Sequence, residues 1–394
     1  MRRALIAAAV LLAAVAGWAW RHHAVGRLTL LAPWARVENF RDMTALFPSH
    51  RIHRPAQSFT FAPAPRRLDV RYTYGGRQDG LDAFLTRTIT TGFLVVHADR
   101  IIDERYFLGA SAASHFTSWS VAKSFVSALV GIAIDEGAIA GVDQPITRYV
   151  PALKGSGYDG VPIRAVLQMS SGVRFDENYA NPLSDVNVMF ARSFLFGSPI
   201  DDTVRARSSE RSPGGAFNYV SVDTQALGML LVRATGRSLA TLAEEKLWGP
   251  LGMEDDADWI TDRAGPGAME YAFCCLNARL RDYAKLGRLY LRGGDWNGRR
   301  IVSEHWVRES LTPGRPDLAL RGLYTPDWDI GYQYQWWIPN GADGEFMAIG
   351  VWGQYVYVNP AADVIIAKTS VDPDFDTHDM ETLAVFRAVA AALR

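Results

Sequence analysis

Ser120 and Lys123, three positions apart, are the residues of this sequence best placed to do chemistry together. Residues three apart on a helix share a face, so the hydroxyl and the amine can meet. The chain that follows, up to about Gly137, is apolar on nearly every side, which predicts a buried helix. Burial lowers the pKa of a lysine, and a neutral amine can activate a serine as a nucleophile. The alternative is a helix-capping serine with a lysine that reaches solvent, which the apolar neighbours disfavour.

Two further motifs could complete such a site. Tyr219 and Ser221 follow a Pro-Gly-Gly turn at 213–215, and a phenol beside an amine can relay a proton to a leaving group. The alternative is an aromatic residue that packs ahead of the next helix. Residues 350–354 (Gly-Val-Trp-Gly-Gln) lie between two expected strands, where glycine allows close approach to a ligand and a strand-edge N–H could serve an oxyanion. A bulge or hairpin turn has the same pattern.

Periodicity and turn signals predict the elements that must position these residues. Runs 89–96 and 101–107 form a hairpin through 98–100. Helices are expected at 120–137, 224–235, 238–247, 278–291 and 379–393. Later strands are expected at 333–338, 346–351, 354–358 and 364–368. Strands at both ends of the chain around a mainly helical middle, about 140–310, predict an α/β domain with an inserted helical lobe.

The composition is that of a folded globular protein. The 394 residues are 48% hydrophobic and 21% charged, which excludes disorder and collagen, and the net charge of −1 gives no overall field for nucleic acid. Cys274 and Cys275 are neighbours, so neither a disulfide nor a zinc site is expected, and the pair is expected to be buried filler. We predict no metal and no cofactor. The oligomeric state is left open.

The N-terminus suggests export. An apolar run from Ala4 to Trp20 follows Arg2-Arg3, so residues 1–21 are expected to be a signal anchor or a cleaved signal peptide. Either route makes the protein membrane-anchored or secreted, with the domain at 85–394 outside the cytoplasm. Residues 22–84 are expected to be an arginine-rich, proline-containing linker; the alternative is a basic surface that contacts anionic lipid headgroups.

Taken in order, the three motifs resemble the serine β-lactamase and penicillin-binding-protein superfamily. Within it they are most similar to the class C-like group of EstB-type esterases and 6-aminohexanoate-dimer hydrolases. Further family-like phrases extend the resemblance over about 85–390, at 118–125, 167–173, 176–179 and 293–298. The resemblance implies a β-lactamase/transpeptidase-like α/β (α+β) fold, with an antiparallel sheet flanked by helices and an inserted all-helical lobe.

The resemblance also implies roles for individual residues. Ser120 would be acylated, Lys123 would be its base and Tyr219 would shuttle the proton. The N–H groups of Ser120 and of Gly353 or Gln354 would form the oxyanion hole.

Other residues match the family less closely. Tyr179 matches a tyrosine that closes over the substrate amide in nylon-oligomer hydrolases, and Ser221 stands where the class C motif has Asn. Residues 351–353 replace the Lys-Thr-Gly motif that holds a β-lactam carboxylate, and the later Lys-Thr-Ser at 368–370 is expected to be a decoy. An apolar pocket could be lined by Trp336, Trp337 and Trp352, although core packing is the default for each.

The first functional hypothesis is therefore a serine hydrolase that cleaves small amides or esters through an acyl-enzyme. The alternatives are a membrane-tethered, penicillin-binding-like receptor, and a D-amino-acid peptidase or β-lactamase. A Ser-His-Asp triad using His97 or His115 is disfavoured because the sequence has no G-x-S-x-G elbow.

Overall fold

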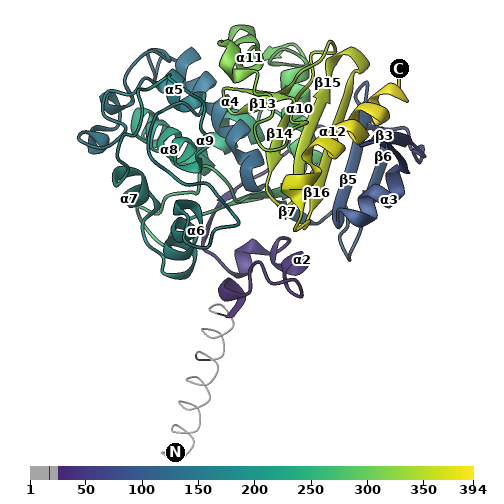
Figure 1. Ribbon diagram of the computed structural model, residues 1–394, viewed down its shortest axis with the longest axis horizontal. Coiled ribbons are helices and arrows are strands. Elements are labelled where there is room, and N and C mark those ends of the chain that lie inside the picture. Colours follow the sequence, from purple (N-terminus) through teal and green to yellow (C-terminus); the bar gives the residue numbers. More distant parts are fainter. Residues whose placement is uncertain (1–16, 18–24) are drawn as a thin grey trace, which may run out of the picture.

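The computed structural model describes residue 17 and residues 25–394, and it contains a large sheet with helices on both faces and a helical lobe beside it (Figure 1). The segment predicted to be a signal anchor or signal peptide, 1–21, lies outside the described residues except for Gly17. None of the helices in the described part of the chain is both long enough and apolar enough to cross a bilayer.

The large sheet has eight strands in the order β12-β13-β14-β15-β16-β5-β6-β2. In that order the strands are Ile330–Gln333, Trp336–Pro339, Phe346–Gly350, Gln354–Asn359, Val364–Ser370, Thr90–His97, Arg100–Tyr106 and Ala62–Pro63. All neighbours are antiparallel except β2 and β6, which are parallel. The predicted antiparallel sheet is therefore wrong at this one edge, where no tight hairpin turn connects the two strands.

Helices cover both faces of this sheet, and alternate residues of β15 contact opposite helices. Val356 packs against α10 (Leu280–Leu291) on one face. Tyr357 points to the other face, where its ring lies 5.3 Å from that of Phe386 in α12 (Phe375–Ala391). The sheet is thus buried between two layers of helix, with α12 in front of it in Figure 1.

The helical lobe packs on α4 (Ala122–Asp135), which is buried along nearly its whole length, as its apolar sequence predicts. Its main partner is α8 (Ser221–Thr235). The other helices of the lobe are α5 (Ile163–Leu167), α6 (Asp185–Phe190), α7 (Ile200–Arg205) and α9 (Leu239–Ala243), which continues as a π-helical turn over Glu244–Trp248. A helical lobe is therefore confirmed, but the predicted range of about 140–310 is not all-helical. It also contains strands at Ala257–Ile260 and Leu276–Arg279, and the helix α10, which covers the large sheet.

A second sheet connects the N-terminal segment with the middle of the chain. Its order is β1-β8-β9-β7, with bounds Ser49–Ile52, Ala257–Ile260, Leu276–Arg279 and His115–Thr117. The segment 22–84 also contains α2 (Arg36–Asn39) and the hairpin of β3 (Arg71–Tyr74) and β4 (Arg77–Gly80). Its residues Leu30, Phe40 and Phe61 are buried in the core. The domain boundary at 84 remains a prediction.

Two elements differ from the sequence-based expectation. The strand expected at 333–338 is the hairpin of β12 and β13, because Tyr334 and Gln335 turn the chain with φ of 36° and 66°. Residues other than glycine are uncommon at such angles, so composition gives no turn signal here. Residues 278–279 end β9 and do not begin the next helix. The smaller elements are α3 (Leu81–Arg87), β10 (Asp295–Trp296), β11 (Arg299–Arg300) and α11 (Glu304–Leu311).

Candidate active site

Ser120 lies in a tight turn, Trp119–Val121, that connects β7 to the buried helix α4. Trp119 has a φ of 40°, in the left-handed region. Ser118 N donates to the Leu276 carbonyl oxygen at 2.7 Å, which ties the turn to β9. Backbone strain of this kind persists only where the surrounding structure enforces it, and it is concentrated at functional sites.

Lys123 lies one turn after Ser120 and is 1% exposed. Its Nζ is 2.7 Å from Ser120 Oγ, 3.1 Å from the Phe273 carbonyl oxygen and 3.2 Å from Ser221 Oγ. Burial lowers the pKa of this amine to about 7, and the charge of Glu177 opposes the effect. A neutral amine has two N–H groups and one lone pair. When Phe273 and Ser221 accept the two N–H groups, the lone pair faces Ser120.

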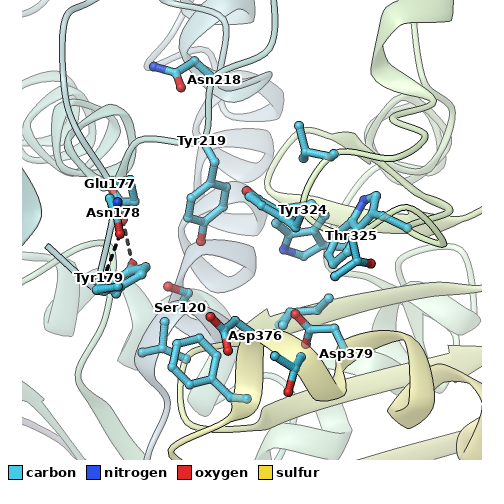
Figure 2. A pocket seen from close by; sticks show the side chains of 18 of the residues that line it. Ser120, Glu177, Asn178, Tyr179, Asn218, Tyr219, Tyr324, Thr325, Asp376 and Asp379 are labelled. Carbon is cyan, nitrogen blue, oxygen red and sulfur yellow. Dashed lines mark hydrogen bonds between the residues drawn. The ribbon is translucent and has the colours of Figure 1, made fainter.

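The ring of Tyr219 covers this amine, with Lys123 Nζ 5.0 Å from the ring centroid. Its hydroxyl points toward Ser120 (Figure 2). The ring stacks on Trp337 at a centroid distance of 5.4 Å, which fixes its orientation. Burial raises the pKa of the phenol well above its ordinary value, so Tyr219 keeps its proton at neutral pH. The structure therefore brings together the serine, the amine and the phenol selected from the sequence.

Glu177 is a part of the site to which sequence analysis assigned no role. Its Oε1 accepts hydrogen bonds from Ser221 Oγ at 2.5 Å and from the Tyr179 hydroxyl at 2.7 Å, and its Oε2 accepts from Ser221 N at 2.8 Å. Because the Ser221 hydroxyl donates to Glu177, its oxygen is free to accept from Lys123. The only sequence signal was the position of Glu177 inside the family-like phrase at 176–179.

The second group that the sequence did not reveal is the backbone carbonyl of Phe273. Every residue has such a carbonyl, so the residue type gives no signal for this contact. The next two residues, Cys274 and Cys275, are joined by a disulfide and are buried. The expectation that these neighbours stay unpaired is wrong. That expectation rested on the rarity of disulfides between neighbouring residues, whose Cα atoms, 3.8 Å apart here, lie closer than in most bridges.

The predicted oxyanion residues, Gly353 and Gln354, lie in the hairpin from β14 to β15. Gly350, at the end of β14, is the close neighbour: a Cβ on it would lie 3.0 Å from Ser120 N. Gln354, on the returning strand, donates its side-chain amide to the Ser370 carbonyl oxygen at 2.8 Å. Gly353 also packs against Ser370. Neither residue is among the described residues that line the cavity over Ser120.

The two residues at the tip of this hairpin also face different surroundings. Val351 lines the cavity, whereas Trp352 lies under the guanidinium of Arg36, 4.3 Å from its ring centroid. Lys368, in the Lys-Thr-Ser run expected to be a decoy, lies outside the cavity between the rings of Phe84 and Tyr355. The part of the sheet that faces Ser120 is therefore the end of β14, at residues 350–351.

A cavity of about 540 Å³ opens over Ser120 (Figure 2). Its walls are mainly aromatic, from Tyr179, Phe217, Tyr219, Tyr324, Trp328, Trp337 and Phe375. Of the three tryptophans considered from the sequence, Trp337 alone lines it, because Trp336 packs in the core against Tyr290 at 4.6 Å. Tyr179 packs edge-on against Phe375 at 6.3 Å, across the cavity wall.

One side of the cavity is acidic. Asp376 and Asp379, near the start of α12, point into it (Figure 2). Asp379 is 9% exposed, its Oδ1 accepts from the Tyr355 hydroxyl at 2.6 Å, and burial raises its pKa to about 7. The described residues that line the cavity include no arginine or lysine. Within residues 25–394, no group of three or more His, Cys, Asp or Glu side chains is arranged to hold a metal ion.

Comparison of sequences connects this arrangement with known hydrolases. The profile of the family described as Beta-lactamase matches residues 81–389. The 6-aminohexanoate-dimer hydrolase of Paenarthrobacter ureafaciens is 32% identical over 346 residues, which is 86% of this chain and 86% of that protein.

Solved structures agree with the sequence matches. A Bacillus anthracis protein assigned as a 6-aminohexanoate-dimer hydrolase aligns with a TM-score of 0.82 and 25% identity, over 92% of this chain and 96% of that one. EstCE1, a hydrolase with promiscuous acyltransferase activity, aligns with a TM-score of 0.59 and 14% identity over 78% of this chain and 96% of that one, a likeness of fold alone. The chain is therefore a hydrolase that belongs to the Beta-lactamase family.

Proposed function

We propose that the protein is a serine hydrolase that cleaves small amides or esters through an acyl-enzyme on Ser120. The observation that carries the proposal is the 2.7 Å distance from Ser120 Oγ to the Nζ of Lys123, a lysine that is 1% exposed. With a pKa of about 7, this amine is neutral in about half of the molecules at pH 7. A neutral amine at hydrogen-bond distance can take the serine proton.

In the acylation step Ser120 Oγ attacks the substrate carbonyl carbon while its proton passes to Lys123. The resulting oxyanion is bound by the N–H of Ser120 and by an N–H at the end of β14, for which Val351 is the candidate. As the C–N or C–O bond breaks, the leaving group takes a proton from Tyr219. Lys123 returns its proton to the phenolate, and the acyl ester on Ser120 remains.

Deacylation reverses these proton transfers. Water attacks the acyl carbonyl carbon and gives a proton to the relay formed by the Lys123 amine and the Tyr219 hydroxyl. Ser120 Oγ leaves with that proton, and the carboxylic acid is released. Throughout the cycle Glu177 fixes Ser221, and Ser221 in turn accepts an N–H of Lys123, so the amine keeps its orientation.

The cavity supports small linear amides or esters as substrates. Its aromatic walls favour an apolar chain, and a volume of about 540 Å³ suits a small molecule. Asp376 and Asp379 can pair with a cationic end of that chain, whereas the lining offers no cation for a β-lactam carboxylate. The relative from Paenarthrobacter ureafaciens is named for the hydrolysis of 6-aminohexanoate dimer, so this linear amide is the first substrate to test.

We also propose that the N-terminal segment directs the domain out of the cytoplasm, as an anchor or as a cleaved signal. The apolar run from Ala4 to Trp20 supports this, as do the exposed side chains of Leu28 and Trp34 close behind it. Fractionation of cells, with detection of the intact protein by mass, tests it. A full-length protein found only in the cytoplasm would overturn it.

The test of the hydrolase compares full-length protein with its Ser120→Ala variant on p-nitrophenyl esters, 6-aminohexanoate dimer and nitrocefin. We expect turnover of the esters or the amide by the unmodified protein, and none by the variant at an unchanged melting temperature. An acyl adduct on Ser120, detected by mass spectrometry after rapid quenching, would confirm the intermediate. Equal activity in the two proteins would overturn the proposal, and a stable penicillin adduct without turnover would favour a receptor.

A further inference from the structure

The segment from Phe273 to Leu276 contacts the proposed base, Lys123, at one end and the residue before the turn of Ser120 at the other. The Phe273 carbonyl oxygen is 3.1 Å from Lys123 Nζ. At the other end Ser118 N donates to the Leu276 carbonyl oxygen at 2.7 Å, and Leu276 N donates to Ser118 Oγ at 3.1 Å. The disulfide-linked cysteine pair lies between these contacts. A covalent link therefore sits between the group that orients the amine and the group that holds the turn of the nucleophile.

The backbone of the cysteine pair is fixed by its neighbours. The Cys274 carbonyl oxygen accepts from Trp259 Nε1 at 2.9 Å. The Cys275 carbonyl oxygen accepts from Ile260 N at 3.1 Å and from Asn277 Nδ2 at 2.9 Å. Cys275 has a φ of 66°, a left-handed conformation that is uncommon outside glycine and needs support from its surroundings.

The packing around this cysteine pair leaves little room for its conversion from a disulfide to two thiols. Cys274 is 1% exposed and Cys275 is 0% exposed. Two thiols need more space than one disulfide, because sulfur atoms that are not bonded stay at van der Waals separation. Since a protein interior is close-packed, reduction has to displace the peptide group between the cysteines. The Phe273 carbonyl belongs to the adjoining peptide group and moves with it.

We propose that the Cys274–Cys275 disulfide is a positioning element of the site, which holds the Phe273 carbonyl where it accepts one N–H of Lys123, so that reduction of the disulfide slows acyl transfer. This inference rests on the proposed function of Ser120 and Lys123. With the carbonyl displaced, one N–H of the amine loses its fixed acceptor. The lone pair is then no longer held toward Ser120 Oγ, and fewer encounters lead to proton transfer.

The redox step is a two-electron exchange with a dithiol. The reductant gives two electrons and two protons, the S–S bond breaks, two cysteine thiols form and the reductant becomes a cyclic disulfide. Because both cysteines are buried, a reductant reaches them only when the segment opens. The state acquired during folding therefore persists in the folded protein, and the two states can be prepared separately and compared.

The experiment compares the full-length protein in its two states. It is prepared under oxidising conditions and, separately, refolded with a dithiol, and the state of the cysteines is read by alkylation and intact mass. Hydrolysis of a p-nitrophenyl ester and labelling of Ser120 by a fluorophosphonate are then measured. We expect kcat and the labelling rate to be about tenfold or more lower in the dithiol form. KM should be unchanged, since the described cavity lining contains no cysteine. Unfolding the dithiol form and refolding it under oxidising conditions should restore kcat.

The double variant Cys274→Ser, Cys275→Ser is the matched control. It should have the low kcat in both preparations and should not recover on reoxidation, with a melting curve that shows a folded protein. Free thiols in a fully active preparation would overturn the proposal. So would a preparation with confirmed reduction in which kcat and the labelling rate are unchanged, or in which KM alone changes. Failure of the proposed function looks different: the oxidised protein would then match Ser120→Ala in turnover and labelling, whatever the state of its cysteines.

Discussion

Replacing Lys123 by arginine keeps a long cationic side chain in the site but removes the base. A lysine with the usual pKa of 10.5 is neutral in about 3 of 10⁴ molecules at pH 7, whereas a lysine with a pKa of about 7 is neutral in about half. Burial of Lys123 thus increases the fraction of usable base about 10³-fold, equivalent to about 4 kcal/mol. Arginine stays protonated in proteins, so Lys123→Arg should lose about 10³-fold or more in kcat/KM.

The pH dependence of the unmodified enzyme tests the same reasoning. Below a pH of about 7 the amine is protonated and has no lone pair for the serine proton, and above it the amine is neutral. The acylation rate should therefore rise with pH, reach half of its maximum near pH 7 and level off above it. Hydrolysis of a p-nitrophenyl ester, followed as kcat/KM from about pH 5 to about pH 9, measures this profile.

Lys154→Arg is the matched control, because Lys154 is exposed and its replacement should leave both the rate and the profile unchanged. Three results would refute the assignment of Lys123 as base. One is a Lys123→Arg enzyme within about tenfold of the unmodified rate. The others are a profile that keeps rising toward the usual lysine pKa, and a rate that falls as the pH passes about 7.

Three further substitutions test other contacts. Gly350→Ala places a Cβ against the turn that carries Ser120, so it should lower kcat about tenfold and stability by about 1–3 kcal/mol. Gly80→Ala, which has open space around it, should change neither kcat in ester assays nor the melting temperature. Glutamine has one acceptor oxygen, so Glu177→Gln cannot accept both hydrogen bonds from Ser221, and kcat should fall about 10- to 100-fold. An effect no larger than that of the exposed Glu210→Gln would contradict this role. Asp379 has a pKa of about 7 in the folded protein and 3.8 ordinarily, so the stability it contributes is complete below about pH 4 and is lost as the pH rises through about 7. Asp379→Asn should therefore gain about 3 kcal/mol over the unmodified protein between pH 5 and pH 8 in urea unfolding, and a constant difference over that range would contradict it.

The part of the site that could be predicted from sequence is the part set by local geometry. Ser120 and Lys123 meet because helical spacing places them on one face, and the amine is buried because the helix is apolar all round. The joining of early and late strands into one sheet was also predictable, since β-rich runs occur at both ends of the chain. Each of these inferences uses residues that are close in sequence or a pattern that repeats.

The remaining features depend on distant or unspecific contacts. The Phe273 carbonyl could belong to any residue type, and only the folded chain shows that it accepts from the lysine. Gly353 and Gln354 were expected at the oxyanion hole, but the residue that lies against Ser120 is Gly350, at the end of the preceding strand. The sequence does not show which of the two strands of a hairpin faces a given residue. The turn at Tyr334 and Gln335 has no glycine, asparagine or proline to mark it.

The pairing of β16 with β5 has a consequence for biosynthesis. β16 lies between β15 and β5, so β5, which is made early in translation, can join the rest of the sheet only after β16 is made near the end. The strand end that lies against the nucleophile, at Gly350, is also made long after the serine itself. Contacts this far apart in sequence form slowly, and a growing chain cannot complete them before the ribosome has released the last strands. A nascent chain is therefore expected to carry Ser120, the proposed nucleophile, in an incomplete site, so that hydrolysis begins only after release from the ribosome.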